Sequence, residues 1–348
     1  MSPFESSPGA CAMEAALDSI LATPDPDLVA MMKRLDGDVI ILGATGKIGL
    51  SLASLAVNAV RESRVPRTVY GVSRFTDPSA WDKLESCGAV PLQADLLDAG
   101  AVETLPRARN VLLLAGRKFG TEGGEALTWA TNTVVPARVA EHFHASRIVA
   151  FSTGCVYPLR SADEGGCSEE VPPDPIGEYS QSCLGRERVL EHYAREYGTE
   201  LLLFRLNYAN DLRYGVLHDI GRAVWEGRAV DNAVSHFNVI WQGDANACAL
   251  RAFELAQSPP GVLNVTGLDM VGVEEAALDM GRLMGREVFF TGEPGDRCYL
   301  SDASKMARLL GRPKMPLDDM IRLQAQWIMN GGVSIGKPTH FEVSNGRF

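Results

Sequence analysis

The stretch of residues 38–60 restricts the fold of this chain more than any other. Four consecutive apolar residues, three of them β-branched, run from Val39 to Leu42 and have the pattern of a buried strand. Three glycines spaced three apart follow, and residues 50–60 then have the pattern of a helix. A strand, a glycine turn and a helix start can hold the pyrophosphate of a dinucleotide, because the free N–H groups of the first helical turn attract phosphate. The residues predicted to contact the phosphates are Gly43, Thr45, Gly46, Lys47, Ile48 and Gly49.

The three glycines are expected to have different roles. Gly43 permits the tight turn, Gly46 lets a phosphate approach the backbone, and Gly49 lets the helix pack closely on the strand. The alternative to a dinucleotide site is an ordinary glycine-rich turn. The strand before the glycines and the helix after them favour the dinucleotide site.

Apolar runs and helical stretches alternate from residue 38 to residue 206. The predicted strands after the first are residues 68–72, 89–92, 110–114, 147–151 and 200–206. Because each run is apolar almost throughout, the alternation predicts an α/β fold with a doubly wound parallel sheet. We expect a helical extension over residues 1–37 that packs on the main domain, a dinucleotide-binding domain over 38–209, and a smaller substrate lobe over 210–348. Strand 262–266 is a candidate to return to the sheet.

Composition narrows the classes of function. The formal charge of −11 over 348 residues argues against a nucleic-acid partner, and no apolar run reaches the length of a membrane span. The N-terminus lacks the basic region of a secretory signal. Seven scattered cysteines without a CxxC pair suit reduced thiols in a cytoplasm. His142 and His144, two residues apart on a predicted helix, face different directions, so we expect no metal site.

The end of the second predicted strand bears on the choice of coenzyme. An acidic residue at that point would bind the adenosine ribose and favour NAD, whereas an arginine accommodates the 2′-phosphate of NADP. Ser73 and Arg74 stand there, so we expect NADP, with NAD as the alternative if Arg74 only stacks on adenine. Asp95 and Leu96 follow the third strand, where the carboxylate either lies over the adenine edge or caps the next turn.

The chain resembles the extended short-chain dehydrogenase/reductases, the group that contains nucleotide-sugar epimerases and dehydratases. The motifs that carry the resemblance are Gly43–Gly49, Ala94–Leu96, Leu114–Gly116, Thr131–Thr133, Phe151–Tyr157, Tyr179, Arg205–Asn207 and Gly261–Gly267. The resemblance implies coenzyme contacts at Leu114, Ala115, Gly116 and Lys118. It also implies that Tyr179 exchanges a proton with a substrate hydroxyl or carbonyl, that Thr153 hydrogen-bonds the same oxygen, and that Asn132 supports the site.

One position departs from the family pattern Tyr-x-x-x-Lys, because Cys183 stands where the lysine is expected. That lysine would hold the nicotinamide ribose and lower the pKa of the phenol, and a neutral thiol supplies no charge. Cys183 is expected to be a packed thiol and not a nucleophile, because no histidine or aspartate lies at a spacing from which it could activate the thiol.

Three explanations of this departure remain open. Lys118, in an Ala-Gly-x-Lys loop similar to that of some epimerases, could replace the missing cation. Alternatively, the tyrosine could act only as an acid, as in the NADPH-dependent enone reductases of the progesterone 5β-reductase group, whose second strand is similar. Finally, the chain could bind the dinucleotide without turnover, as a sensor or scaffold.

The substrate side is less constrained by the sequence. The resemblance implies that the smaller lobe selects the substrate and that Asn207 contacts a phosphate of a nucleotide sugar. Tyr208 and Arg213 offer further aromatic and polar groups for a sugar-like metabolite, although lobe packing would explain each of the three as well. The acidic loop of residues 155–177 is either a substrate cover or a solvated surface loop, and residues 336–342 remain unassigned. Family members form two-fold dimers through the helices that correspond to residues 122–144 and 179–197, so we expect a homodimer.

Overall fold

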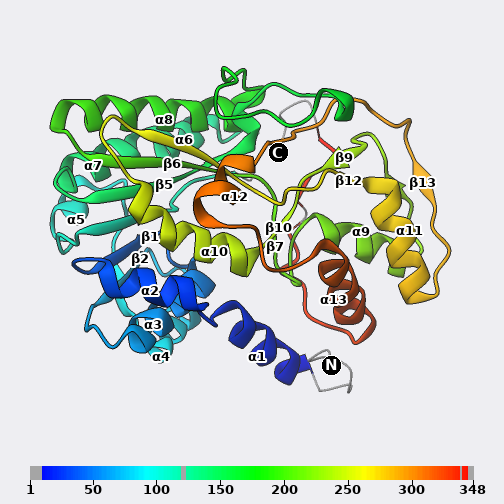
Figure 1. Ribbon diagram of the computed structural model, residues 1–348, viewed down its shortest axis with the longest axis horizontal. Coiled ribbons are helices and arrows are strands. Elements are labelled where there is room, and N and C mark those ends of the chain that lie inside the picture. Colours follow the sequence, from blue (N-terminus) through cyan, green and yellow to red (C-terminus); the bar gives the residue numbers. More distant parts are fainter. Residues whose placement is uncertain (1–9, 119–122, 338, 344–348) are drawn as a thin grey trace.

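A seven-stranded parallel sheet forms the centre of the computed structural model, which describes residues 10–118, 123–337 and 339–343 (Figure 1). In spatial order the strands are β11 (Gly261–Val265), β6 (Glu200–Leu206), β5 (Arg147–Thr153), β4 (Asn110–Leu113), β1 (Val39–Leu42), β2 (Val69–Ser73) and β3 (Val90–Gln93). The predicted α/β class with a doubly wound sheet is confirmed. The chain leaves β1 towards β2 and then returns to β4 on the other side, so the strand order reverses beside β1.

Both faces of the sheet are buried under helices. Alternate residues of β1 point to opposite sides, so Val39 and Ile41 join one core cluster while Ile40 and Leu42 join another. The helices of the first cluster are α2 (Pro26–Arg34), α3 (Gly49–Ser63), α4 (Ser79–Cys87), α10 (Gln242–Arg251) and α12 (Ser304–Leu310). Those of the second are α5 (Ala99–Glu103), α7 (Val135–His142) and α8 (Gly177–Tyr197). This double burial explains why the strands are apolar throughout.

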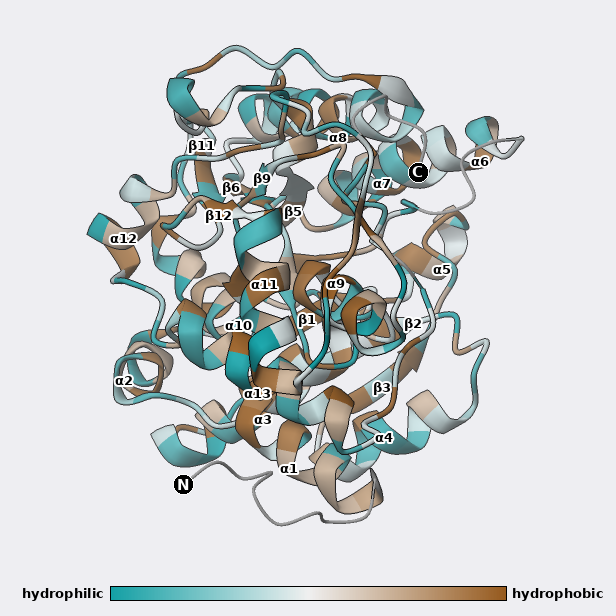
Figure 2. Cartoon of the chain, turned by 90° about the vertical axis from the view of Figure 1, so that its right-hand side faces the viewer, coloured by the Kyte–Doolittle hydropathy of each residue, from teal (hydrophilic) through white to brown (hydrophobic). Residues whose placement is uncertain are grey.

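A second lobe is built on three helices, α9 (Val216–Trp225), α11 (Val273–Met284) and α13 (Leu317–Met329), which share one core cluster. Figure 2 faces this lobe and shows hydrophobic and hydrophilic segments alternating along α11 and α13, as expected for helices with one buried side. Three two-stranded pieces complete it: β7 (Ala209–Asn210) with β10 (Ile240–Trp241), β9 (His236–Phe237) with β12 (Val271–Gly272), and β8 (Val230–Asp231) with β13 (Phe290–Thr291). Short 3₁₀ turns lie at Gly154–Val156, Ala162–Glu164 and Ala252–Leu255.

Both N-terminal helices contact helices α3 and α10 of the sheet domain. Helix α1 (Ala10–Leu21) also places Met13, Leu17 and Leu21, which are spaced four apart, in the core cluster of the second lobe. Because one face of α1 meets the lobe, the extension links the two parts of the molecule.

The region that the sequence predicts to be helical, residues 122–144, is helical over residues 125–142, and residue 122 lies outside the described residues. The run consists of α6 (Glu125–Trp129), a π-helical turn (Ala130–Val134) and α7. Pro136 has no N–H to donate, which is consistent with the altered hydrogen-bond pattern just before it.

Asp244 connects the first turn of α10 to the segment before α13. Its carboxylate accepts the backbone N–H groups of Lys314 and Met315.

Among the described helices, none is both long and apolar enough to cross a membrane. All seven cysteines fall in the described part of the chain and are free.

Candidate functional site

The glycine turn between β1 and α3 has a conformation that only glycines permit. Gly43 has a φ of +100°, and a Cβ there would lie 2.8 Å from the backbone nitrogen of Ala115. A Cβ at Gly49 would lie 2.5 Å from the carbonyl oxygen of Ala44, so the start of α3 packs directly on the turn. The result is a tight backbone turn at a helix N-terminus, in which side chains at these two positions would collide with neighbouring backbone.

A cavity of about 300 Å³ extends from this turn to the ends of β2 and β3. Its lining includes Thr45, Ser73, Arg74, Asp95, Leu96 and Gly116. The hydroxyls of Thr45 and Ser73 share a hydrogen bond of 2.5 Å, and the Arg74 side chain is exposed. Asp95 accepts the N–H of Leu97 at 2.9 Å, so its carboxylate caps the next turn while remaining exposed at the cavity.

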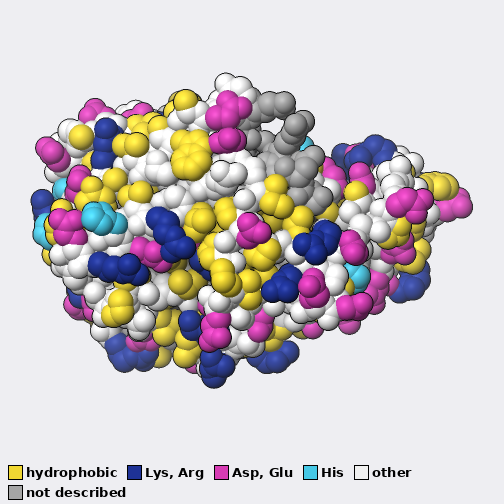
Figure 3. Space-filling model, turned by 90° about the horizontal axis from the view of Figure 1, so that it is seen from above, with side chains coloured by type: hydrophobic (Ala, Val, Ile, Leu, Met, Phe, Trp, Pro, Cys, Tyr) yellow, Lys and Arg dark blue, Asp and Glu magenta, His cyan; other side chains and the backbone are white. Residues whose placement is uncertain are grey.

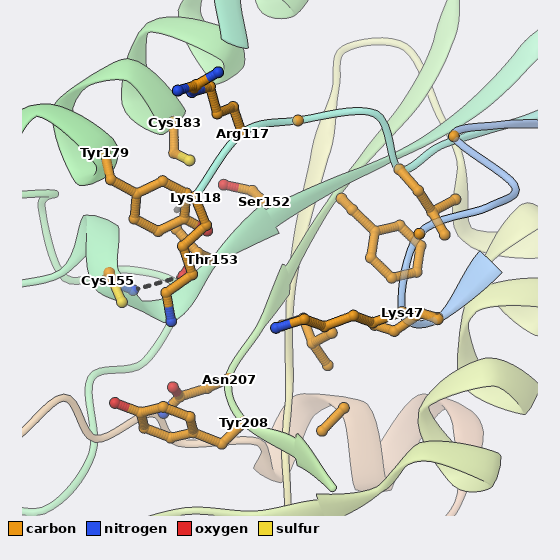
Figure 4. A pocket seen from close by; sticks show the side chains of 18 of the residues that line it. Lys47, Arg117, Lys118, Ser152, Thr153, Cys155, Tyr179, Cys183, Asn207 and Tyr208 are labelled. Atoms are coloured by element: carbon orange, nitrogen blue, oxygen red, sulfur yellow. Dashed lines mark hydrogen bonds between the residues drawn. The ribbon is translucent and has the colours of Figure 1, made fainter. Parts of the chain in front are cut away.

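A second cavity, of about 370 Å³, opens at the carboxyl ends of the strands where their order reverses, the usual place for a ligand in such sheets (Figure 4). We call it the central cavity. It is lined by the glycine turn, by the loop after β4, by the ends of β5 and β6, and by the first turns of α8. The sequence-predicted residues that it brings together are Gly43, Gly46, Lys47, Ile48, Gly49, Leu114, Gly116, Lys118, Thr153, Tyr179, Asn207 and Tyr208.

Tyr179 lies in the first turn of α8 with its ring directed into the central cavity, beside Thr153 at the end of β5 (Figure 4). Burial raises the pKa of the phenol well above its usual value, and a hydrogen bond with the Thr153 side chain acts in the opposite direction. The Thr153 hydroxyl also accepts the N–H of Cys155 at 3.1 Å. At neutral pH the phenol is therefore protonated and can donate.

Asn132, in the π-helical turn, ties the loop after β4 to α8. Its side-chain oxygen accepts the N–H of Arg117 at 2.9 Å and Nη2 of Arg186 at 2.7 Å. Its nitrogen donates to the carbonyl of Arg117 at 3.0 Å and to the Ser182 hydroxyl at 2.9 Å. With these four bonds Asn132 supports the site from behind and is not among the residues that line the central cavity.

Position 183 carries a buried neutral group. Burial raises the pKa of the Cys183 thiol to about 11, so the thiol supplies no charge at neutral pH. Lys118 approaches the tyrosine from the loop after β4, with Nζ 5.9 Å from the ring centroid of Tyr179 and 3.3 Å from the carbonyl oxygen of Thr339. Burial lowers the pKa of Lys118.

The sequence did not single out Arg186, which is 5% exposed and lines the central cavity. A basic residue seven positions after Tyr179, on the buried side of its helix, is the signal that could have identified it. Its neighbour Glu187 is fully buried and binds elsewhere, to Arg205 at 2.6 Å and to the Ser152 hydroxyl at 2.5 Å.

The central cavity gathers positive charge. Lys47, Arg117, Lys118 and Arg186 line it, and among the described residues no acidic side chain does so. Nζ of Lys47 lies 3.4 Å from the ring centroid of Tyr214. Burial, helped by the nearby charges of Lys118 and Lys337, lowers the pKa of Lys47 to about 7. On the outer face shown in Figure 3, by contrast, acidic and basic side chains are intermixed, and the whole chain has a net charge of −11.

The predicted substrate residues have different surroundings. Asn207 and Tyr208 line the central cavity, and Asn207 donates to the carbonyl of Tyr299 at 3.1 Å. Arg213 does not line it: its guanidinium binds Asp211 at 2.7 Å and Asp18 of α1 at 2.8 Å. The structure therefore gives Arg213 a packing role that joins α1 to the lobe.

The unassigned C-terminal segment crosses the rim of the central cavity. Thr339 lines the cavity, and its N–H and hydroxyl both donate to the Asp219 carboxylate, at 2.7 and 2.6 Å. Phe341 is buried in the core of the second lobe, 6.4 Å from Phe237 between ring centroids. The segment is thus anchored at Thr339, the residue that meets Lys118, and two residues later at Phe341.

The structure offers no metal centre within the described ranges, where no three His, Cys, Asp or Glu side chains converge.

The loop after β5 is held against the lobe, through backbone pairing of Arg160 with Cys298 and of Cys167 with Ser301.

A profile of the NAD-dependent epimerase/dehydratase family matches residues 39–209, which include the glycine turn, Thr153 and Tyr179. The domain that these residues form belongs to this family, and the predicted resemblance is thereby confirmed. The match includes the sheet strands β1 to β6, whereas β11 lies beyond it. No curated protein sequence matches this family member.

Solved structures of similar fold extend the comparison to the second lobe. UDP-glucose 4-epimerase from Thermotoga maritima, solved with UDP-glucose, has 19% sequence identity and a TM-score of 0.70 over 84% of this chain and 98% of its own. dTDP-glucose 4,6-dehydratase from Bacillus anthracis, solved with NAD, has 16% identity and a TM-score of 0.70 over 85% and 97%. UDP-glucose 4-epimerase from Thermus thermophilus, also with NAD, has 19% identity and a TM-score of 0.69 over 85% and 100%. At these identities the likeness concerns the fold.

Proposed function

We propose that this family member is an NAD(P)-dependent oxidoreductase or epimerase that acts on a hydroxyl or carbonyl group of a polar, sugar-like metabolite, with Tyr179 as the general acid/base. The observation that carries the proposal is the central cavity, which places the glycine turn, Tyr179 and Thr153 around one space. A proton-exchanging phenol next to a dinucleotide site is the arrangement that hydride transfer to or from a carbonyl carbon requires.

The glycine turn fits a dinucleotide, because its glycines allow close packing on the backbone of Ala44 and Ala115 and place the turn at the N-terminus of α3. Gly43, Gly46 and Gly49 would hold the pyrophosphate, and the cavity towards β2 and β3 would take the adenosine. Arg74, exposed at the rim of that cavity where no acidic residue follows β2, supports a preference for NADP over NAD. When bound, the nicotinamide supplies the hydride acceptor or donor.

Side chains of this protein would then bind the substrate oxygen and exchange its proton. Tyr179 donates or accepts its proton, and Thr153 hydrogen-bonds the same oxygen. Lys118 would stand in for the lysine missing at position 183, since its ammonium approaches the Tyr179 ring from the opposite loop. A cation beside the phenol stabilises the phenolate that substrate oxidation needs.

A nucleotide sugar is the substrate class that we favour. Asn207 and Tyr208 present polar groups to the central cavity, and its four cations suit an anionic ligand. Similar folds have been solved with UDP-glucose, which supports this class.

The raised pKa of Tyr179 favours one second candidate, a carbonyl or enone reductase in which the phenol acts only as an acid. A proton donor with a high pKa is adequate for reduction, whereas oxidation needs the phenolate. A dinucleotide-binding protein without turnover is the remaining alternative.

A coenzyme-binding and turnover assay separates these functions. We expect binding of NADP(H), and hydride transfer with at least one member of a panel of nucleotide sugars and sugar-derived ketones, which Tyr179→Phe reduces by 10²–10⁴-fold. Activity with simple ketones or enones alone would favour the reductase. Tight binding without turnover, rescued by Cys183→Lys, would indicate a silent binder, and no affinity for either coenzyme would refute the proposal.

We also infer a two-fold dimer, because Leu127, Val134 and Tyr197 leave apolar surface exposed on α6, the π-helical turn and α8. Light scattering at micromolar concentration tests this inference, and a monomeric mass would contradict it.

A further inference from the structure

One charged side chain of the central cavity, that of Arg186, has no part in the chemistry proposed above. Cys183 and Arg186 follow Tyr179 by four and seven residues along α8. Because a helix repeats every 3.6 residues, these three side chains lie on one face of α8. Arg186 therefore belongs to the same row as the tyrosine and the missing lysine, one turn further along.

The hydrogen bonds of Arg186 connect the parts of the site. Nη1 donates to the carbonyl of Phe151 in β5 at 2.7 Å, and Nη2 donates to the carbonyl of Ala115, just beyond β4, at 3.0 Å. Nη2 also donates to the side-chain oxygen of Asn132 at 2.7 Å. The ends of two strands and the π-helical turn are thus held by one guanidinium.

The charge of Arg186 is not neutralised by a carboxylate. Within the described ranges Arg186 forms no ion pair, and its buried Nε has no hydrogen-bond partner. The carboxylate of Glu187, the adjacent residue, accepts hydrogen bonds from Arg205 and Ser152 instead. A guanidinium is charged at every accessible pH, so a fixed positive charge faces the central cavity, balanced only by dipoles.

The surrounding sequence leaves room for this guanidinium. A Cβ at Gly116 would overlap Nη2 of Arg186, so a side chain after β4 would displace the guanidinium from its present position. A lysine at position 183 would place a second cation one turn from Arg186, and like charges at that spacing repel. The small, neutral Cys183 avoids this repulsion.

Building on the proposed function, we propose that Arg186 is a positioning residue that acts beside Lys118 and supplies, from the helix itself, part of the positive charge lost with the missing lysine. From one helical turn beyond position 183, its fixed charge favours ionisation of Tyr179, while its three hydrogen bonds hold β4, β5 and Asn132 in place. The direction of the electrostatic effect is consistent with this role. Burial is the largest influence and raises the pKa of Tyr179 and of Cys183, and Arg186 lowers both.

The test is a titration of the phenol itself. A fluorinated tyrosine incorporated at position 179 has a lower intrinsic pKa than tyrosine, which brings its ionisation into a pH range where the fold survives. We expect Arg186→Met to raise the pKa of the labelled phenol by about one, a tenfold loss of phenolate at a given pH. Arg186→Lys should change it far less. Arg188→Met, which removes an exposed arginine of the same helix, is the matched control.

Two further variants separate charge from structure. Arg186→Gln keeps a hydrogen-bond donor without the charge, so it should raise the pKa of the phenol as Arg186→Met does, and it is available if the methionine variant does not fold. Adding Cys183→Lys to Arg186→Met should return the pKa towards that of the parent. The same pKa in the parent, Arg186→Met and Arg186→Gln would overturn the inference.

This titration needs neither substrate nor turnover. If Arg186→Met raises the pKa of the phenol in a protein that never transfers hydride, the proposed function is refuted and the role of Arg186 stands. If the pKa is unchanged in a protein that does transfer hydride, the role of Arg186 is refuted and the proposed function stands. Where turnover is found, the pH profile of kcat should move to higher pH in Arg186→Met, whereas a purely structural loss would lower kcat equally at every pH.

Discussion

Lys47 leads to a quantitative prediction about proton uptake on ligand binding. Its ammonium lies in the central cavity, on the turn that would hold the coenzyme pyrophosphate, and its pKa is lowered to about 7. A bound dianion stabilises the ammonium, so the pKa of Lys47 rises towards its ordinary value of about 10.4. Binding is therefore coupled to protonation of Lys47 at every pH between these two values.

The magnitude follows from the pKa of about 7 in the ligand-free protein. At pH 7 about half of the Lys47 side chains are neutral, and binding takes up about 0.5 proton; at pH 8 about 0.9 are neutral, and uptake approaches one. The affinity for NADP(H) should fall about tenfold per pH unit above 8 and be nearly constant below 6.

Calorimetry at pH 8 in buffers of different ionisation enthalpy measures this uptake directly. Lys47→Met should abolish the uptake and weaken binding at pH 6 more than at pH 9. Lys83→Met, which removes an exposed lysine on α4, should alter neither. Zero uptake in the parent at pH 8, or equal uptake in parent and Lys47→Met, would refute the coupling.

Three other substitutions test separate parts of the structure. Arg74→Asp should shift the ratio of NADP to NAD affinity towards NAD by at least tenfold, measured by fluorescence titration; an unchanged ratio would exclude Arg74 as the determinant. Lys118→Met should lower turnover about 10²-fold with the fold intact by circular dichroism, whereas unchanged turnover would exclude Lys118 as the substitute cation. Glu187→Ala leaves Arg205 charged and buried, so urea unfolding should show a loss of about 3–5 kcal/mol, against less than about 1 kcal/mol for the exposed Glu254→Ala control.

The parts of the site that were predictable from sequence are governed by local constraints. The glycine spacing restricts backbone conformation within a few residues, and Gly43 shows that restriction in its φ of +100°. The apolar strands were also visible, because burial on both faces leaves no place for polar residues. Tyr179 and Thr153 were identified through ordered family motifs, and the structure places both at the central cavity.

The remaining features depend on pairs far apart in the chain. Arg186 meets Asn132 across 54 positions, and Lys118 meets Thr339 across 221, so no local pattern announces either contact. Arg213 was chosen for its type alone, yet long-range docking of α1 supplies Asp18 as its partner. The additional contact of α1 with the core of the second lobe was not predicted for the same reason, because its apolar face does not specify which core it enters.

The anchoring of the C-terminal segment matters for how this protein is produced and assayed. Thr339 offers its carbonyl to Lys118 at the rim of the central cavity, and its N–H and hydroxyl donate to the Asp219 carboxylate. A shortened protein that lacks Thr339 would lose the hydrogen-bond partners of both Lys118 and Asp219. Kinetic data from such a protein should therefore be compared with those from protein that retains the segment.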